Sequence, residues 1–111
     1  MSVLTIRSHR RYAMRLPVEV ERDGGSNTSG LLIELSQQGA RISNLRDADY
    51  VAGEQVWIQT ADDTALEGTV RWAHDGLAGV RLNRSLHLPE LRDLLEANRR
   101  EVESVELQYG T

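Results

Sequence analysis

The chain has 111 residues, of which 40% are hydrophobic and 27% charged, and a formal net charge of −4; these values are typical of a folded globular domain. It contains no cysteine, which excludes a disulfide framework and thiolate metal sites. No apolar run approaches the roughly 18 residues of a membrane span, and none follows the N-terminus as a signal peptide requires. We therefore expect a single soluble, cytoplasmic domain over residues 1–111, with no membrane as a partner.

The beginning of the chain is basic, although the chain as a whole is acidic. The first fifteen residues contain no acid and four arginines: Arg7, Arg10, Arg11 and Arg15. Few apolar residues accompany them, so we expect a flexible arginine-rich arm over residues 1–15. Apolar and polar residues then alternate from Leu16 to Glu21, which is typical of a half-buried strand.

Short apolar segments separated by turn residues continue to residue 83. The segment Asp23–Gly30 is rich in Gly, Ser and Asn, which favour turns. Five further strands are expected, the last two after the hairpin-length connections "ADDT" and "HDG": residues 31–35, 40–43, 55–60, 66–73 and 77–83. Six short strands without an intervening helix predict a mainly β fold, a six-stranded antiparallel β-barrel over residues 16–83.

The hydrophobic period changes after residue 88. Pro89 suits a first helical turn, and leucines and valines follow at a 3–4 spacing, with Asn98 at one of these positions. We expect one amphipathic C-terminal α-helix over residues 89–104. Two roles fit this helix: it caps the barrel, which we favour, or it forms a coiled-coil seam in which Asn98 sets the register.

Residues for catalysis or metal binding do not group in the sequence. The three histidines show no metal-ligand spacing: His9, His74 and His87. Ser36 has no histidine partner that the sequence identifies, and no glycine-rich loop leads from a strand into a helix. We therefore expect a binding protein rather than an enzyme, with no metal and no cofactor.

The arginines at the start of the first strand have a spacing that suits a ligand. Arg11 and Arg15 are four residues apart, which sends both side chains to the same side of an extended or a helical segment. Each guanidinium can bind a phosphate, or the O6 and N7 atoms of a guanine, with two hydrogen bonds. The alternatives, a solvated basic arm or ion pairs with Glu19 and Glu21, are equally plausible from these residues alone.

Two short motifs suggest a family. "RYAMR" (Arg11–Arg15) has the form R-x-x-x-R directly before the first expected strand. "ELSQQG" (Glu34–Gly39) follows the form D/N-x-S-x-x-G at Ser36 and Gly39, with glutamate in the first position. In this order, and with the flanking segments "RLPVEV", "GARIS" and "VRWAHDGLAGVRL", they resemble the PilZ domain family, which binds the bacterial messenger cyclic di-GMP. The resemblance spans about residues 7–95.

The resemblance implies a PilZ-type six-stranded barrel with a C-terminal helix, acting as a cyclic di-GMP receptor that signals to a downstream partner protein. The arginine arm of such a receptor is flexible without ligand and folds over the messenger on binding. Arg11 and Arg15 would hold guanine edges and phosphates, and Ser36 and the backbone around Gly39 would form the opposite wall. An arginine at the position of Arg10 tends to accompany the binding of two stacked ligands per protomer in the family. For Arg10, this role and that of a solvated arginine at the end of the arm are equally plausible.

Glu34 is the position at which the chain departs from the family motif. Asp or Asn can hydrogen-bond the backbone two residues on and so fix the turn, whereas glutamate is one methylene longer. In the family the aspartate also accepts from the guanine edge; Glu34 can offer a carboxylate there, but from a displaced position, so an intact, a weakened and a lost site all remain open. Gly39 is expected to provide either a positive φ or a close approach of the backbone.

Two other function classes fit the sequence. One is a degenerate PilZ-like adaptor that contacts proteins and does not bind the nucleotide. The other is a small barrel that binds nucleic acid through the arginine arm. The negative net charge and the scarcity of aromatic residues oppose it, so no nucleic acid polymer is expected as a partner. Trp57 and Trp72 lie in expected strands; core packing is the expected use of at least one, and Trp72 is expected to be structural first and close to the ligand second.

Overall fold

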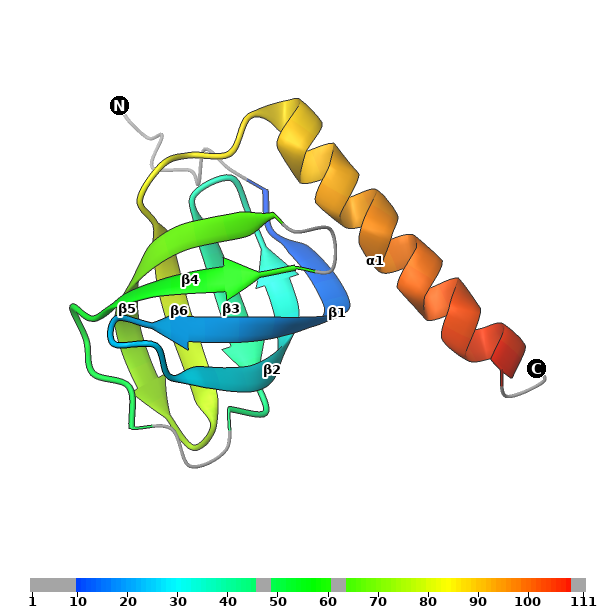
Figure 1. The fold of residues 1–111 in the computed structure, drawn as a ribbon. Helices are drawn as coiled ribbons and strands as arrows, with labels where there is room; N and C mark the ends of the chain where they lie inside the picture. The colour runs from blue at the N-terminus through cyan, green and yellow to red at the C-terminus, as the bar shows by residue number, and fades with distance from the viewer. Residues whose placement is uncertain (1–9, 46–48, 61–63, 109–111) are drawn as a thin grey trace.

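The computed structural model describes residues 10–45, 49–60 and 64–108, with side chains as far as Arg100. Six strands come first and one helix follows (Figure 1). The elements are β1 (Tyr12–Arg22), β2 (Asn27–Leu35), β3 (Gly39–Ser43), β4 (Gln55–Gln59), β5 (Ala65–His74), β6 (Leu77–Leu82) and α1 (Leu88–Gln108). The predicted order, six strands and then a C-terminal helix, is confirmed.

The strands close into a barrel because β1 pairs along both of its edges. The neighbour order is β1-β2-β3-β6-β5-β4, and every pair is antiparallel. β1 is 11 residues long, so it pairs with β2 along most of its length and with β4 through Glu19–Arg22. Closure leaves no free sheet edge, and the predicted antiparallel barrel is confirmed.

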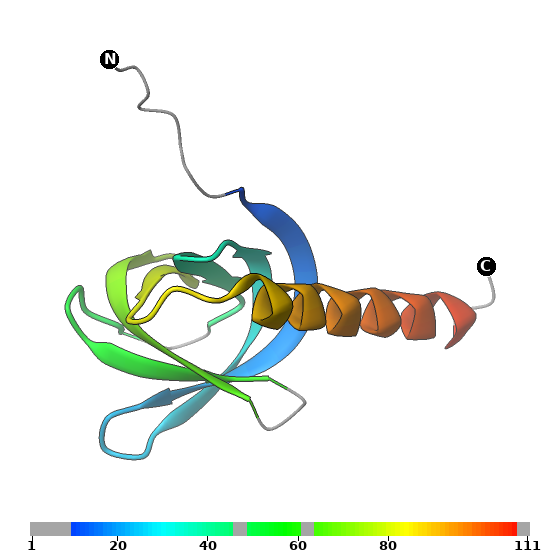
Figure 2. The same cartoon turned by 90° about the horizontal axis from the view of Figure 1, so that it is seen from above.

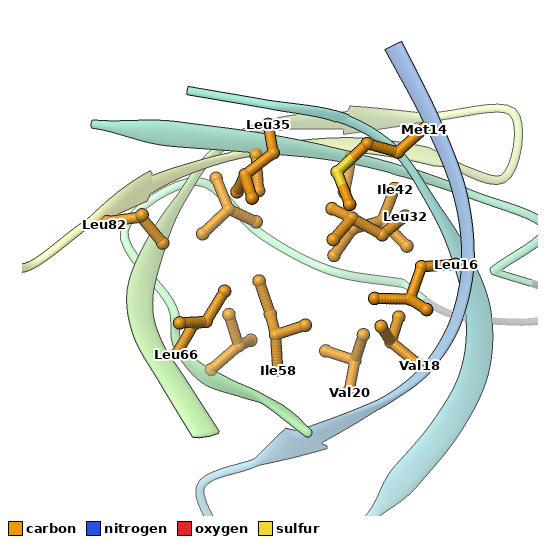
Figure 3. Close-up of a cluster of buried hydrophobic side chains, with 14 of the residues drawn as sticks. Met14, Leu16, Val18, Val20, Leu32, Leu35, Ile42, Ile58, Leu66 and Leu82 are labelled. Carbon is orange, nitrogen blue, oxygen red and sulfur yellow. The ribbon is translucent and has the colours of Figure 1, made fainter. Parts of the chain in front are cut away.

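Alternation along the strands fills the barrel with aliphatic side chains (Figure 3). In β1, Met14, Leu16, Val18 and Val20 are buried, while the residues between them are exposed. Side chains of the other strands meet them: Leu32, Leu35, Ile42, Val56, Ile58, Leu66, Val70, Val80 and Leu82. Burial of one such side chain contributes roughly 1.5–3 kcal/mol, so this interior is the main source of stability.

The arginine arm is shorter than predicted. β1 begins at Tyr12, so residues 12–15 belong to the barrel and not to an arm that ends at residue 15. The physical reason is Met14, which is 4% exposed and anchors this part of the chain in the core. Residues 1–9, the rest of the predicted arm, lie outside the described part of the chain.

The turns take less of the chain than predicted. β2 begins at Asn27 and not at residue 31, because Gly24 and Gly25, with φ of 104° and 91°, reverse the chain after β1. The β5–β6 connection is the expected tight hairpin. Asp75 and Gly76 form its two-residue loop, and both have the positive φ that a type I′ turn requires.

α1 is longer than predicted, from Leu88 to Gln108 in place of residues 89–104. Leu91 and Leu94 are buried against the barrel and Leu95 packs beside them, so the capping role is confirmed. Seen from above, the second half of the helix extends beyond the barrel (Figure 2). No helix in the described part of the chain is long and apolar enough to cross a membrane.

The start of α1 is fixed by charged side chains. Glu90 accepts from the His87 amide at 2.8 Å and pairs with both terminal nitrogens of Arg84 at 3.1 and 2.9 Å. The hydrogen bonds from Arg84, and then that from His87, lower the pKa of Glu90 to about 2. An ionised carboxylate in the first turn also interacts favourably with the helix dipole.

A bulge in β1 is the point at which α1 and the barrel are joined. The pairing of β1 with β2 shifts between Ala13 and Leu16, so Arg15 has no directly opposed residue in β2. The Arg15 amide instead donates to Oδ1 of Asn98 at 2.7 Å. The Asn98 side chain therefore has an intramolecular partner, which differs from the register-setting role that a coiled-coil seam would give it.

Asn98→Ala removes this acceptor. We expect the free energy of unfolding to fall by about 0.5–1.5 kcal/mol, because water can replace part of an exposed hydrogen bond. Urea unfolding measures the change. Asn98→Asp keeps an oxygen acceptor and should remain near the wild type; equal losses in the two variants would show that the bond does not contribute.

Arg22, at the end of β1, is held by acidic side chains. Its Nε and Nη2 donate to Glu54 at 2.5 and 3.0 Å, and its Nη1 donates to Asp49 at 3.2 Å. The guanidinium also lies 4.5 Å from the centre of the Tyr50 ring. The hydrogen bond from Arg22 is the largest cause of a lowered pKa at Glu54. These contacts fasten β1 to the segment before β4.

The lowered pKa of Glu54 makes stability depend on pH. Its contribution is fully present above the unfolded-state pKa of about 4.3 and is lost as the pH falls through the lower folded-state pKa. Glu54→Gln should cost about 1.5 kcal/mol at pH 7, the low end for hydrogen bonds to charged groups, because Arg22 and Glu54 are partly exposed. The difference from the wild type should shrink below about pH 4. Urea unfolding of both proteins over this pH range measures the difference in unfolding free energy. A difference that does not change with pH would contradict the prediction.

Candidate functional site

The arginines of the first motif lie at the start of β1 and on its outer side. Arg10 and Arg11 precede the strand, Arg15 lies within it, and all three are exposed. Because Met14 and Leu16 point into the core, Arg15 between them points outward. The guanidinium groups of Arg10 and Arg15 form no ion pair with another residue that the structure describes.

Glu34, the first residue of the second motif, lies beside this segment. Its partner across β1 is Ala13 and its partner across β3 is Arg41. Glu34 Oε1 is 3.9 Å from Arg11 Nη1, and the two side chains are 30% and 48% exposed. A pair this long and this exposed contributes at most about 1 kcal/mol, so a ligand can displace it at little cost.

The turn from Ser36 to Gly39 is held by its own hydrogen bonds. The Ser36 hydroxyl oxygen accepts from the amides of Gln38 and Gly39 at 3.3 and 3.1 Å. The Ser36 amide donates to the Gly39 carbonyl at 2.9 Å. Ser36 therefore shapes the turn, and two of its acceptor positions are already used within the chain.

Gly39 provides a close approach and not a positive φ. A Cβ atom at this position would lie 3.2 Å from the Val80 carbonyl oxygen and 3.9 Å from Ser36 Oγ. The first contact is tighter than most side chains tolerate, and the carbonyl belongs to the neighbouring strand β6. Of the two explanations offered for this glycine, the structure supports the second.

The turn is also fastened to the segment that leads into α1. Gln37 and Leu86 exchange two hydrogen bonds: Gln37 Nε2 donates to the Leu86 carbonyl and the Leu86 amide donates to the Gln37 carbonyl, each at 2.8 Å. The Leu82 amide donates to the Gln38 carbonyl, also at 2.8 Å. Both motifs are thus joined to α1 or its approach, the first through Asn98 and the second through Leu86.

An aromatic and cationic group lies beside the motifs, and of its members only Trp72 was expected from the sequence; Arg41 and His74 were missed. Arg41 lies across β3 from Glu34, with its guanidinium carbon 5.7 Å from the centre of the Trp72 ring. The His74 ring stacks on Trp72 at 5.2 Å. Trp72 covers Gly79, where a Cβ would lie 2.4 Å from indole atoms. The alternation of "GARIS" could have placed Arg41 on the outer face.

The expectation of a tryptophan in the core was wrong. Trp57 and Trp72 are both partly exposed, and neither belongs to the cluster of buried side chains. In β4, the buried neighbours Val56 and Ile58 force Trp57 outward. In β5, the pairing with β6 shifts between Val70 and Trp72, which the sequence does not reveal.

The assembled groups suit an anionic ligand with hydrogen-bonding edges. They comprise three exposed arginines, a carboxylate, a rigid turn, and an indole next to a fourth arginine. Among the residues that the structure describes, no group of three or more His, Asp or Glu side chains could hold a metal ion. These groups lie on the outer wall formed by β1, β2, β3 and β5.

Comparison with known proteins identifies the family of this domain. Residues 5–98 match the PilZ domain. The chain belongs to the PilZ domain family. The match includes all six candidate residues, Arg10, Arg11, Arg15, Glu34, Ser36 and Gly39. PilZ domains are binding and effector domains of cyclic di-GMP signalling, and not enzymes.

The PilZ fold is also found in the comparison with solved structures. The inhibitor of motility MotI/DgrA from Bacillus subtilis superposes with a TM-score of 0.60 over 93% of this chain, at 15% sequence identity. The alignment spans only 55% of the Bacillus chain. At this identity the similarity concerns the fold alone. No curated protein matches the sequence.

Proposed function

We propose that this PilZ domain is a receptor for cyclic di-GMP, which it binds between the arginines at the start of β1 and the Ser36–Gly39 turn. The observation that carries the proposal is the 3.9 Å approach of Arg11 to Glu34. It brings the two motifs together on one outer wall, although they are far apart in the sequence. Membership of the family supplies the class of ligand.

The chemistry of the ligand fits the groups on this wall. Cyclic di-GMP carries two anionic phosphodiesters and two guanine rings. Arg11 and Arg15 can bind phosphate oxygens or the O6 and N7 atoms of guanine with two hydrogen bonds each. Glu34 can accept from the N–H groups of the guanine edge. Trp72, with Arg41 beside it, offers a ring and a cation on which a base can stack.

The two ends of the arginine motif have different roles in the proposal. The backbone of Arg15 is fixed, because its amide is bonded to Asn98 and its neighbour Met14 is buried. Arg10 and Arg11 precede the strand, so they can close over the ligand when it binds. Closure exchanges the weak Arg11–Glu34 pair for charge-assisted bonds to phosphate, which favours the bound form.

Hydrogen bonds to α1 would connect the bound ligand to a surface that a downstream partner protein recognises. The Gln37–Leu86 bonds join the turn to the start of α1, and the Asn98 bond joins Arg15 to its middle. A ligand that shifts either motif would therefore alter the hydrogen bonds that hold the helix. The helix and the closed arginine segment would together form the surface that a partner recognises.

Arg11→Ala and Arg15→Ala should each weaken cyclic di-GMP binding by about ten- to a hundred-fold, because each removes a charge-assisted contact worth roughly 1.5–3 kcal/mol. Isothermal titration calorimetry on the wild type and the variants measures this. Arg100→Ala is the matched control: it removes the same charge from an exposed position of α1, on the face opposite Leu91 and Leu94.

Equal and small losses in all three variants would indicate general charge attraction in place of a site. A folded wild type that binds no cyclic di-GMP would contradict the receptor function and favour a protein-interaction adaptor. Titration with single-stranded DNA should give no comparable binding, and binding that depended on Arg11 would favour a nucleic acid function.

Glu34→Asp should tighten cyclic di-GMP binding or leave it unchanged. The shorter carboxylate moves away from Arg11, which frees that guanidinium for the ligand, and it can close the turn through the backbone near Ser36. The gain should be roughly 0.5–1.5 kcal/mol, about one hydrogen bond, with little change in stability. Calorimetry beside the wild type tests it, and clearly weaker binding would show that the longer Glu34 side chain makes a productive contact.

A further inference from the structure

A pocket opens in the outer wall of the barrel beside the Ser36–Gly39 turn. Its volume is about 550 Å³, within the range of roughly 300–1,000 Å³ that is usual for small-molecule sites. Gln38 of the turn lines the pocket, whereas Glu34 and the residues of the arginine motif do not. The residues that matter to its chemistry are Gln38, Thr69, Arg71, Arg81, Asn83 and Ser85.

Two arginines from adjacent strands reach this pocket. Arg81 of β6 lies between Gly39 of β3 and Thr69 of β5. Arg71 is the residue at which the β5–β6 pairing shifts, so it has no directly opposed residue in β6. Both arginines are exposed, and in the described ranges neither forms an ion pair. Their charge is therefore available to an anion.

The polar side chains between the arginines are already held in place. Asn83 accepts from the Thr69 hydroxyl at 2.8 Å and donates to Gln55 at 2.9 Å. The Leu82 amide bonds the Gln38 carbonyl at 2.8 Å, which fixes the turn against β6. A pocket whose floor is ordered before binding costs less entropy to occupy. No acid is among its lining residues in the described part of the chain.

We propose that Arg71 and Arg81 form an anion site that binds a phosphate group of the ligand held by the Ser36–Gly39 turn. Two guanidinium groups and the Gln38 amide can surround a phosphate with donors, the geometry that arginine favours. Arg81 is the strand neighbour of Gly39, about 5 Å away between backbones, so one dinucleotide can reach both places. The identity of the ligand rests on the proposed function; the anion site itself does not.

Arg71→Gln and Arg81→Gln test the site in calorimetric titrations with cyclic di-GMP at constant salt. Each should weaken binding about ten-fold, which is the loss of about 1.4 kcal/mol. Arg100→Gln makes the same charge change on the far face of α1 and should stay within about two-fold of the wild type. Circular dichroism checks that each variant is folded. If the two pocket variants match Arg100→Gln, the ligand does not use this site and the proposal is overturned.

A second titration tests the pocket without reference to cyclic di-GMP. Sodium pyrophosphate is added to the labelled protein while the side-chain Nε–H signals of the arginines are followed by NMR. The Arg71 and Arg81 signals should shift and saturate, whereas that of Arg100 should follow ionic strength alone. Shifts at Arg71 and Arg81 no larger than that at Arg100 would overturn the anion site. Saturable shifts in a protein that does not bind cyclic di-GMP would keep the anion site and reject the proposed function.

Discussion

The bulge in β1 leaves the Arg15 amide without a partner in β2, and Asn98 of α1 accepts its hydrogen bond at 2.7 Å. This bond fixes Arg15, which belongs to the arginine motif, follows a core residue and is bonded to the helix. On the inner side of the same strand, Met14 is buried. The constraint explains why the arginine motif is divided between a fixed part and a part that precedes the strand. The backbone of Arg15 is therefore held in place without a ligand.

The second motif is constrained in a comparable way by the barrel wall. Ser36 closes its turn, Gly39 allows the turn to lie against β6, and the reciprocal bonds of Gln37 and Leu86 fasten it to the start of α1. The outer wall is thus rigid, and the arginine side chains on it are only weakly held. The 3.9 Å pair of Arg11 and Glu34 is the weakest of these contacts, and it is the one that ligand binding would replace.

The barrel could be predicted from the sequence because period-two alternation and turn residues report local structure directly. The core contains Leu16, Val18 and Val20 because every second side chain of the strand faces inward, as the alternation indicates. The arm boundary was wrong because one methionine among arginines gives no periodic signal, although it is enough to anchor a strand. The expectation that at least one tryptophan lies in the core was wrong, and for Trp72 the orientation follows a pairing shift at Arg71. The pocket of Arg71 and Arg81 depends on the same shift and on the Ser36–Gly39 turn, which lies far from both arginines in the sequence.

Backbone amide NMR during a titration of the wild type with cyclic di-GMP tests the central claim most directly. Saturable changes should be concentrated at residues 10–15 and 34–41, with smaller changes in the first half of α1. The hairpin around Gly24 and Gly25, which lies at the other end of β1, should be unaffected. Saturable binding whose changes avoid both motifs, or spectra that do not change at all, would contradict the account.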